Sequence, residues 1–304
     1  VYFNNKSFDE RIYQEVVSAA IKGDKHTHLV SKEDFEANFP TIINAMDMPT
    51  TDGINTWFIS KFAHDDGLKA VLSGLGADEL FGGYPSFTRI AHIQQLRSLP
   101  KALFKAAAQL PFDKYRKIAF LAHDHPLADY LFLRGLFIPE DIARILGMDL
   151  KQVNEILFSE SAANYPRTYD QEHAAWLETN LYMQNQLLRD TDVMGMSHGV
   201  EVRVPFLDED LQAVINSISP DIRFDHYQPK KFLVDSFKNI LPRAVWDRPK
   251  MGFTFPLQQW MSAQPEISTE QLYPGKHMQR IISKFKKEQV HWSKAYALYQ
   301  LQNV

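Results

Sequence analysis

Apolar and polar positions over the first 89 residues predict helices that alternate with short strands. Apolar residues recur at helical spacing through Ile12, Val16 and Ala20, and helical patterns also cover residues 32–45, where Pro40 interrupts, and 52–65. β-branched and aromatic residues at positions 1–3, 26–30 and 70–72 predict strands between these helices. The alternation predicts an α/β fold with a doubly wound parallel sheet.

The pattern becomes helical after residue 89. Amphipathic segments at residues 90–96 and 102–110, separated by prolines, predict a helical insertion over residues 90–174. Residues 175–262 then return to the core, with a helix over 175–188, an extended piece at 202–205, a helix capped by Asp208 and a helix over 230–241. Residues 263–304 read as a polar helical tail, so we expect one domain over 1–304 with a large helical portion.

Composition excludes several classes of function. The net charge of −4 gives no basic excess for nucleic acid, and the absence of cysteine excludes disulfides and a thiol nucleophile. No apolar run approaches the roughly 20 residues that span a bilayer. We therefore expect no membrane or nucleic-acid partner and a cytoplasmic location.

The densest group of candidate residues is KAVLSGLGADELFGGY at positions 69–84. A strand runs into Ser73, Gly74 and Gly76, where glycine lets a backbone approach a ligand, and a short helix follows. Asp78 and Glu79 lie at the start of that helix. They could be helix-capping residues or a carboxylate site for a metal ion.

Four ordered blocks resemble the asparagine synthetase family, in its ATP-dependent synthetase domain. They are residues 47–50 (DMPT), the SGLGADELFGGYPSF stretch, DTDVMGMSHGVEVRVPFLD at 190–208, and PKKFLVDSFKNILPRAVWDRPKMGFTFPLQQW at 229–260. The resemblance covers about residues 1–260. It implies an adenine nucleotide alpha hydrolase-like fold in which a carboxylate is adenylated with ATP and Mg²⁺ and ammonia then forms an amide.

The resemblance also implies roles for single residues. Asp78 matches the family aspartate that holds Mg²⁺ beside pyrophosphate, and Lys230 matches the active-site lysine, although Lys231 next to it leaves the register open. Ser73, Gly74, Leu75 and Gly76 would line the nucleotide. The alternatives are an ordinary turn for the loop and a solvated lysine for Lys230.

Other polar residues have structural readings that compete with functional ones. Glu201 and Arg203 share one face of an extended piece, so a salt bridge is expected. The block with Arg248, Lys250, Gly252 and Phe253 is either a loop near the nucleotide or a structural clamp. The histidine pairs at 26 and 28 and at 123 and 125 lack a third ligand at usable spacing, so zinc is not expected.

The sequence departs from the family in two places. Leu75 occupies the position of a family carboxylate that serves as base for the incoming amine, and leucine cannot accept a proton. The pyrophosphate loop S-G-G-x-D-S and the glutaminase domain do not occur in these 304 residues. We therefore expect a fragment of a synthetase, with a slot beside the strand at 70–72 and weak ATP affinity by itself.

Three functions remain open from the sequence. The leading hypothesis is part of a glutamine-dependent asparagine synthetase-like ligase, with aspartate or an analogue as acceptor and ammonia from a glutaminase domain. The second is an amide-forming cyclase or a peptide or sugar amidotransferase of the same family, which Leu75 favours. The third is a catalytically incomplete fragment. A homodimer is possible in each case.

Overall fold

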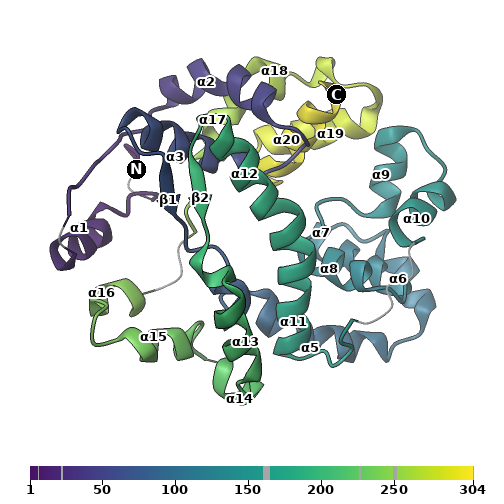
Figure 1. Ribbon diagram of the computed structural model, residues 1–304. Helices are drawn as coiled ribbons and strands as arrows, with labels where there is room; N and C mark the ends of the chain where they lie inside the picture. The colour runs from purple at the N-terminus through teal and green to yellow at the C-terminus, as the bar shows by residue number, and fades with distance from the viewer. Residues whose placement is uncertain (6, 22, 160–164, 226, 249–251, 304) are drawn as a thin grey trace.

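The computed structural model describes residues 1–5, 7–21, 23–159, 165–225, 227–248 and 252–303. These residues are mainly helical and contain one small parallel sheet (Figure 1). Strand β1 (Ala70–Leu72) pairs in parallel with β2 (Glu201–Arg203), with Val71 opposite Val202. The parallel pair agrees with the predicted α/β class. Two strands are too few to display a doubly wound sheet, which stays a prediction.

The helices of the first 65 residues follow the apolar pattern. They are α1 (Arg11–Ala20), α2 (Lys32–Ala45) and α3 (Gly53–Asp65). Helix α2 begins with a capping box in which Ser31 and Asp34 bond to each other's backbone N–H groups. The expected interruption at Pro40 is wrong, because Pro40 is exposed and the helix continues through it, at the cost of one backbone hydrogen bond.

The strands expected at residues 1–3 and 26–30 are reduced to one parallel bridge between Tyr2 and Leu29. Tyr2 N donates to His28 O at 2.9 Å, and Val30 N donates to Tyr2 O at 3.0 Å. Within the described part of the chain, no backbone hydrogen bond joins residues 1–3 to β1. Leu72 of β1 is 75% exposed, so the strand is poorly covered.

The middle of the chain is helical, as its periodicity predicts. Two apolar clusters hold it together, one centred on Ile93 and Phe104 and the other on Phe120 and Ile138. Its elements are α4 (Ala77–Phe81), α5 (Ser86–Arg97), α6 (Lys101–Ala107), α7 (Asp113–Arg116), the 3-10 helix η1 (Lys117–Ala122), α8 (Pro126–Arg134), α9 (Pro139–Leu146) and α10 (Leu150–Phe158).

One long helical rod separates the sheet from this middle region (Figure 1). It consists of α11 (Gln171–Leu177), the π-helix η2 (Glu178–Leu187) and α12 (Leu188–Met196). After β2 the chain forms η3 (Pro205–Leu207), α13 (Glu209–Ser217), α14 (Pro220–Arg223), α15 (Lys231–Phe237) and α16 (Arg243–Trp246). Asp208 caps α13 as expected, since its Oδ1 accepts from Leu211 N at 3.1 Å.

The C-terminal helices contribute to the main hydrophobic core, although the composition of residues 263–304 suggested a polar tail. Helices α17 (Leu257–Ser262), α18 (Pro265–Ser268), η4 (Glu270–Leu272), α19 (Gly275–Lys286) and α20 (Trp292–Gln302) lie against α2 and α3 (Figure 1). Tyr296 is fully buried, and its ring lies 6.2 Å from that of Phe39. An amphipathic helix buries one apolar stripe and exposes the rest of its surface. Its overall composition can therefore be polar although one face belongs to the core.

Buried polar side chains connect the loop after β1 with the middle region. Gly76 N donates to Glu79 Oε2 at 3.1 Å, and Tyr84 Oη donates to Glu79 Oε1 at 2.9 Å. The Arg134 guanidinium lies over the Tyr84 ring and pairs with Glu178 at 2.7 Å. Helix α8 and the π-helix are therefore tied to the loop through charged and aromatic groups.

The π-helix supplies several members of this buried polar chain. Glu178, Tyr182 and Gln186 follow one another at i, i+4 and i+8. Tyr182 Oη and Gln186 Nε2 both donate to Asp52 Oδ2, at 2.8 and 2.7 Å. Wide helical turns are frequent at functional sites. Here the π-helix places Glu178, Tyr182 and Gln186 on one face, where they contact Arg134 and Asp52.

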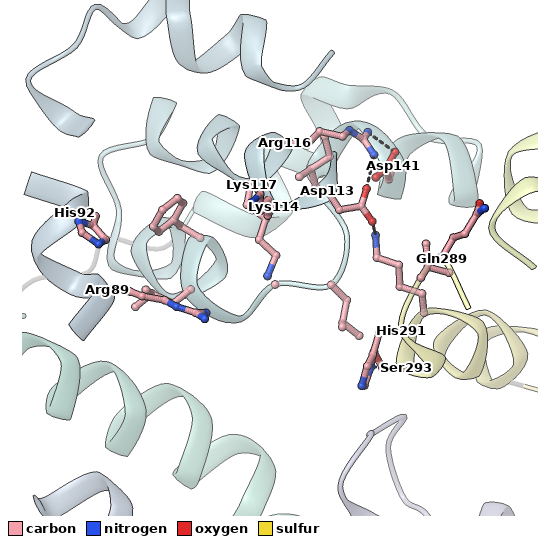
Figure 2. A pocket seen from close by; sticks show the side chains of 17 residues that line it. Arg89, His92, Asp113, Lys114, Arg116, Lys117, Asp141, Gln289, His291 and Ser293 are labelled. Carbon is pink, nitrogen blue, oxygen red and sulfur yellow. Dashed lines mark hydrogen bonds and ion pairs between the residues drawn. The ribbon is translucent and has the colours of Figure 1, made fainter. Parts of the chain in front are cut away.

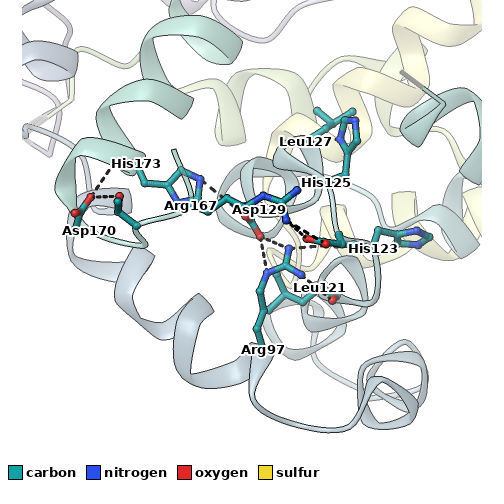
Figure 3. Close-up of polar contacts among 11 residues, drawn as sticks. Arg97, Leu121, His123, His125, Leu127, Asp129, Arg167, Asp170 and His173 are labelled. Atoms are coloured by element: carbon teal, nitrogen blue, oxygen red, sulfur yellow. Dashed lines mark hydrogen bonds and ion pairs between the residues drawn. The ribbon is translucent and has the colours of Figure 1, made fainter. Parts of the chain in front are cut away.

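A second buried ion pair holds α5 against α8 (Figure 3). The Arg97 guanidinium binds Asp129, which is fully buried, and also donates to the carbonyl oxygens of Leu121 and His123. His173 from α11 faces the same carboxylate at 3.9 Å. Burial lowers the pKa of His173 to about 4, so this imidazole is neutral in the core at pH 7.

We expect Arg134→Met to lower the free energy of unfolding by about 3–5 kcal/mol, because it leaves Glu178 buried without its cation. Arg167→Met is the matched control, since its ion pair with Asp124 is more than half exposed and should contribute less than about 1 kcal/mol. Urea denaturation measures both. The double variant Arg134→Met/Glu178→Leu should recover part of the loss. Equal effects of the two arginine changes would contradict a buried role for Arg134.

The buried carboxyl group of Asp190 should make the free energy of unfolding decrease as the pH rises. Burial raises its pKa to about 7, against a hydrogen bond from Thr50 Oγ1 at 2.5 Å. A raised folded-state pKa gives stability that is present below the unfolded pKa, near 4, and lost by about pH 7. Asp190→Asn should remove this decline, worth at most about 4 kcal/mol, in urea titrations at pH 4.5 and 8. Exposed Asp192→Asn is the control; a similar effect there would refute the assignment.

Candidate functional site

The loop between β1 and α4 has a backbone that only glycine can form at position 76. Gly76 has a φ of +95°, and a Cβ there would lie 2.8 Å from Leu207 Cδ2 and 3.0 Å from Phe206 Cβ. Leu75 N donates to Ser73 Oγ at 3.3 Å, which closes the turn. Gly74 has open space around it. The predicted nucleotide loop thus packs against η3 at Gly76, whereas no other group among the described residues covers it at Gly74.

Asp78 and Lys230, which the sequence nominated separately, lie together in the structure. Lys230 Nζ is 3.0 Å from Asp78 Oδ1, and the two side chains are 34% and 26% exposed. A Cβ on Gly83 would lie 1.6 Å from Asp78 Oδ1, so residue 83 must be glycine for the carboxylate to sit there. Gly83 N also donates to Asp78 O at 2.8 Å. The absence of a side chain at Gly83 therefore makes room for Asp78.

Lys230 has an unusual backbone for a lysine. Its φ is +57°, in the left-handed region, and its N–H donates to Phe81 O at 3.2 Å. Lys231 instead forms an ion pair with Asp235, one turn along α15. Of the two adjacent lysines, Lys230 is thus the one directed at Asp78. Strain of this kind in a bulky residue points to a functional constraint.

The pair presents a cation and a carboxylate at the end of a strand, both reachable from solvent. Such a pair suits a phosphate group and a divalent ion, since lysine acts as a point charge for phosphate and Mg²⁺ takes carboxylate oxygens. The described residues contain no group of three or more potential metal ligands. Asp78 therefore fits Mg²⁺ only as a shared ion that also binds the phosphates of a nucleotide.

Glu79, next to Asp78, has a different environment. It is 1% exposed, and both of its oxygens accept hydrogen bonds, from Gly76 N and Tyr84 Oη. Burial raises the pKa of Glu79 above its usual range. Glu79 therefore shapes the loop rather than facing a ligand, which is the capping role that the sequence left open for it.

The remaining nominated residues have structural partners. Glu201 and Arg203 form an exposed ion pair at 3.0 Å. Arg248 pairs with Glu10 at 2.7 Å and lies over the Tyr13 ring, so it clamps α16 to α1. Phe253 O accepts from Asn55 of α3, and Gly252 is exposed. Lys250 lies outside the described residues.

The histidine pairs also have local partners. His26 and His28 both approach Asp66, at 3.2 and 2.8 Å, and His125 Nδ1 caps α8 by accepting from Leu127 N. Neither pair belongs to a group of three or more side chains that could hold a metal ion, among the residues that the structure describes.

Sequence reasoning missed the buried groups behind the loop. Arg134 and Glu178 were not nominated, and Tyr84 was read only as the end of a motif. The spacing of Glu178, Tyr182 and Gln186 was the available signal, since three polar groups on one helical face in a core segment require partners.

Two cavities flank α4, one of about 240 Å³ beside Gly83 and one of about 360 Å³ beside Glu79.

Comparisons with known proteins identify the family. Residues 1–291 match the asparagine synthase family profile. Asparagine synthetase [glutamine-hydrolyzing] 1 of Bacillus subtilis (strain 168) is 26% identical over 273 residues, 86% of this chain and 42% of that protein. A putative asparagine synthetase [glutamine-hydrolyzing] of Mycobacterium bovis is 28% identical over 274 residues, 86% of this chain and 41% of that protein.

A third relative has a different name. Amidase chyE of Penicillium rubens is 24% identical over 270 residues, 78% of this chain and 40% of that protein. No solved structure matches significantly. No helix among the described residues is long and apolar enough to cross a membrane. The chain spans about two fifths of the length of these curated relatives and belongs to the asparagine synthase family.

Proposed function

We propose that this chain forms the ATP-dependent carboxylate-activating part of an amide-forming ligase. The observation that carries the proposal is the 3.0 Å contact between Lys230 and Asp78 at the glycine loop after β1. Family membership supports ligase chemistry, and the names of the relatives support glutamine as the nitrogen source. The doubly wound, adenine nucleotide alpha hydrolase-like sheet belongs to the same proposal.

The first step joins a carboxylate oxygen of the acceptor to the α-phosphorus of ATP, and the bond to pyrophosphate breaks. Lys230 would lie against the phosphate oxygens, where charge builds up in the transition state. Asp78 would hold Mg²⁺ together with those phosphates, and the ion would neutralise part of their charge. The uncovered loop of Ser73, Gly74, Leu75 and Gly76 would accept the nucleotide against its backbone.

This role requires the ion pair to exchange partners. Without a nucleotide, Lys230 neutralises Asp78; with one, the lysine would turn to phosphate and the carboxylate to the metal. The pair is only partly buried, so breaking it does not leave either charge unsolvated. The left-handed backbone of Lys230 and the missing Cβ of Gly83 keep the two residues next to each other while their side chains change partners.

In the second step, the nitrogen of ammonia attacks the activated acyl carbon, AMP leaves with the bonding electrons, and the nitrogen gives up a proton. Leu75 cannot take that proton. Asparagine synthesis from aspartate is therefore one of two proposals for the product. The other is amide formation on a different acceptor, by a cyclase or by a peptide or sugar amidotransferase, and Leu75 is the feature that favours it.

Lys230→Ala should slow carboxylate-dependent ATP–pyrophosphate exchange roughly 100-fold while changing the KM for ATP much less, because its charge acts mainly in the transition state. Asp78→Asn, which keeps the size, should abolish the Mg²⁺-dependent exchange, because it removes the charge that would hold the ion. The assay uses the natural protein that contains this sequence. Lys231→Ala is the matched control and should stay within about twofold, since Lys231 pairs with Asp235. The reverse order of the two lysines would refute the assignment.

Leu75 can be tested through pH. With no carboxylate at this position, amide formation from ammonium salts should rise steadily with pH, because only the neutral amine reacts. Leu75→Glu should flatten the profile, whereas Leu75→Gln, of similar size but not ionisable, should leave it unchanged. Product formation is measured at saturating ATP. Identical profiles for Leu75→Glu and the parent would place the base elsewhere.

A further inference from the structure

A further cavity lies away from the candidate site, between the middle region and the C-terminal helices. Its volume is about 700 Å³, within the range of sites for small organic ligands. Figure 2 shows Arg89, Lys114 and Lys117 on one side and Gln289, His291 and Ser293 on the other. None of residues 73–84 and neither Asp78 nor Lys230 lines it. Any ligand here is therefore distinct from the proposed nucleotide.

The charges around this cavity are unbalanced. Five lysines and arginines line it, against two aspartates: Arg89, Lys114, Arg116, Lys117 and Lys294 face Asp113 and Asp141. The aspartates are already engaged, Asp113 with Lys294 and Asp141 with Arg116 at 2.7 Å. Among the described residues no ion pair involves Arg89, Lys114 or Lys117, although the Lys114 ammonium lies 4.7 Å from the centre of the Tyr115 ring. A chain with a net charge of −4 thus gathers unpaired cations around one hollow.

Lys117 is the most enclosed of these unpaired cations. It begins the 3-10 helix η1 and is partly buried. Burial lowers its pKa, and the charges of Lys294 and Arg89 lower it further. Arg89 and Lys114 are exposed and keep their hydration, so the cost of burial falls on Lys117. An anion that enters the cavity would offset that cost.

The rest of the wall is apolar. Phe132, Leu133 and Leu136 follow one another at the end of α8 and beyond it, and Ile138 and Val290 complete this side. A purely inorganic anion would leave these groups unused. Lysine ammonium groups suit a tetrahedral phosphate, because they act as point charges without the planar geometry that arginine offers to carboxylates.

We propose that this cavity binds a small organic phosphate, with its phosphate group between Lys117, Lys114 and Arg89 and its apolar body against Phe132 and Leu133. The two walls come from segments far apart in the sequence, residues 89–141 and 289–294. A bound phosphate would join them, so the ligand also stabilises the packing of the middle region on α20.

The test uses 1-naphthyl phosphate as the probe, in calorimetry on the 304-residue chain. The parent should bind it, and Lys117→Met should weaken binding about tenfold or more, as expected for a lost charge-assisted contact. Lys105→Met is the matched control, because Lys105 is exposed on neighbouring α6 and does not line the cavity. Lys230→Met should bind the probe like the parent. Inorganic phosphate and naphthalene dicarboxylate should bind more weakly.

A second readout separates binding from folding. Without the probe, Lys117→Met should melt at the same temperature as the parent or higher, since it removes a repelled, partly buried cation. With the probe, only the parent and the control should gain stability. Absence of binding by the parent, unchanged binding by Lys117→Met, equal loss in Lys105→Met, or loss only in Lys230→Met would each overturn the proposal. Equal affinity for inorganic phosphate would overturn the role of the apolar wall.

Discussion

The ion pair between Lys230 and Asp78 is the contact on which the candidate site depends. It joins the start of α4 to the start of α15, two segments that the middle region and the long helix separate in the sequence. Two backbone features permit it: the left-handed conformation of Lys230 and the absence of a side chain at Gly83. A β-carbon at 83 or an ordinary helical backbone at 230 would separate the two charges.

Behind this pair, the geometry of the loop depends on buried polar groups. Glu79 accepts hydrogen bonds from Gly76 and Tyr84, and Arg134 lies on the Tyr84 ring while it pairs with Glu178. Each of these groups would be costly to bury alone, and together they satisfy one another. These contacts connect the loop to the middle region, so a shift of α8 or the π-helix would also displace the loop and Asp78.

The hydrophobic cores explain how the site is held in place although the described residues contain only two short strands. The main hydrophobic cluster joins α2 and α3 to the C-terminal helices, and a second cluster joins α5 and α6 to α11. The long helical rod passes between them and carries Asp190, Glu178 and Tyr182 inward. The cavity with Lys117 lies where the middle region meets the C-terminal helices, and cations from both sides of that boundary line it.

The sequence by itself determined the helices and the glycine loop with its candidate residues. Local periodicity specifies a helix, and only glycine can occupy backbone positions such as Gly76, so both leave a signal in neighbouring residues. The sequence could not show which of Lys230 and Lys231 lies beside Asp78. It also could not show that Arg134 and Glu178 lie behind Tyr84. It also could not show that the apparent polar tail is part of the core. These outcomes depend on contacts between residues far apart in the chain, whose energies are set by burial and by distances that only the tertiary structure creates.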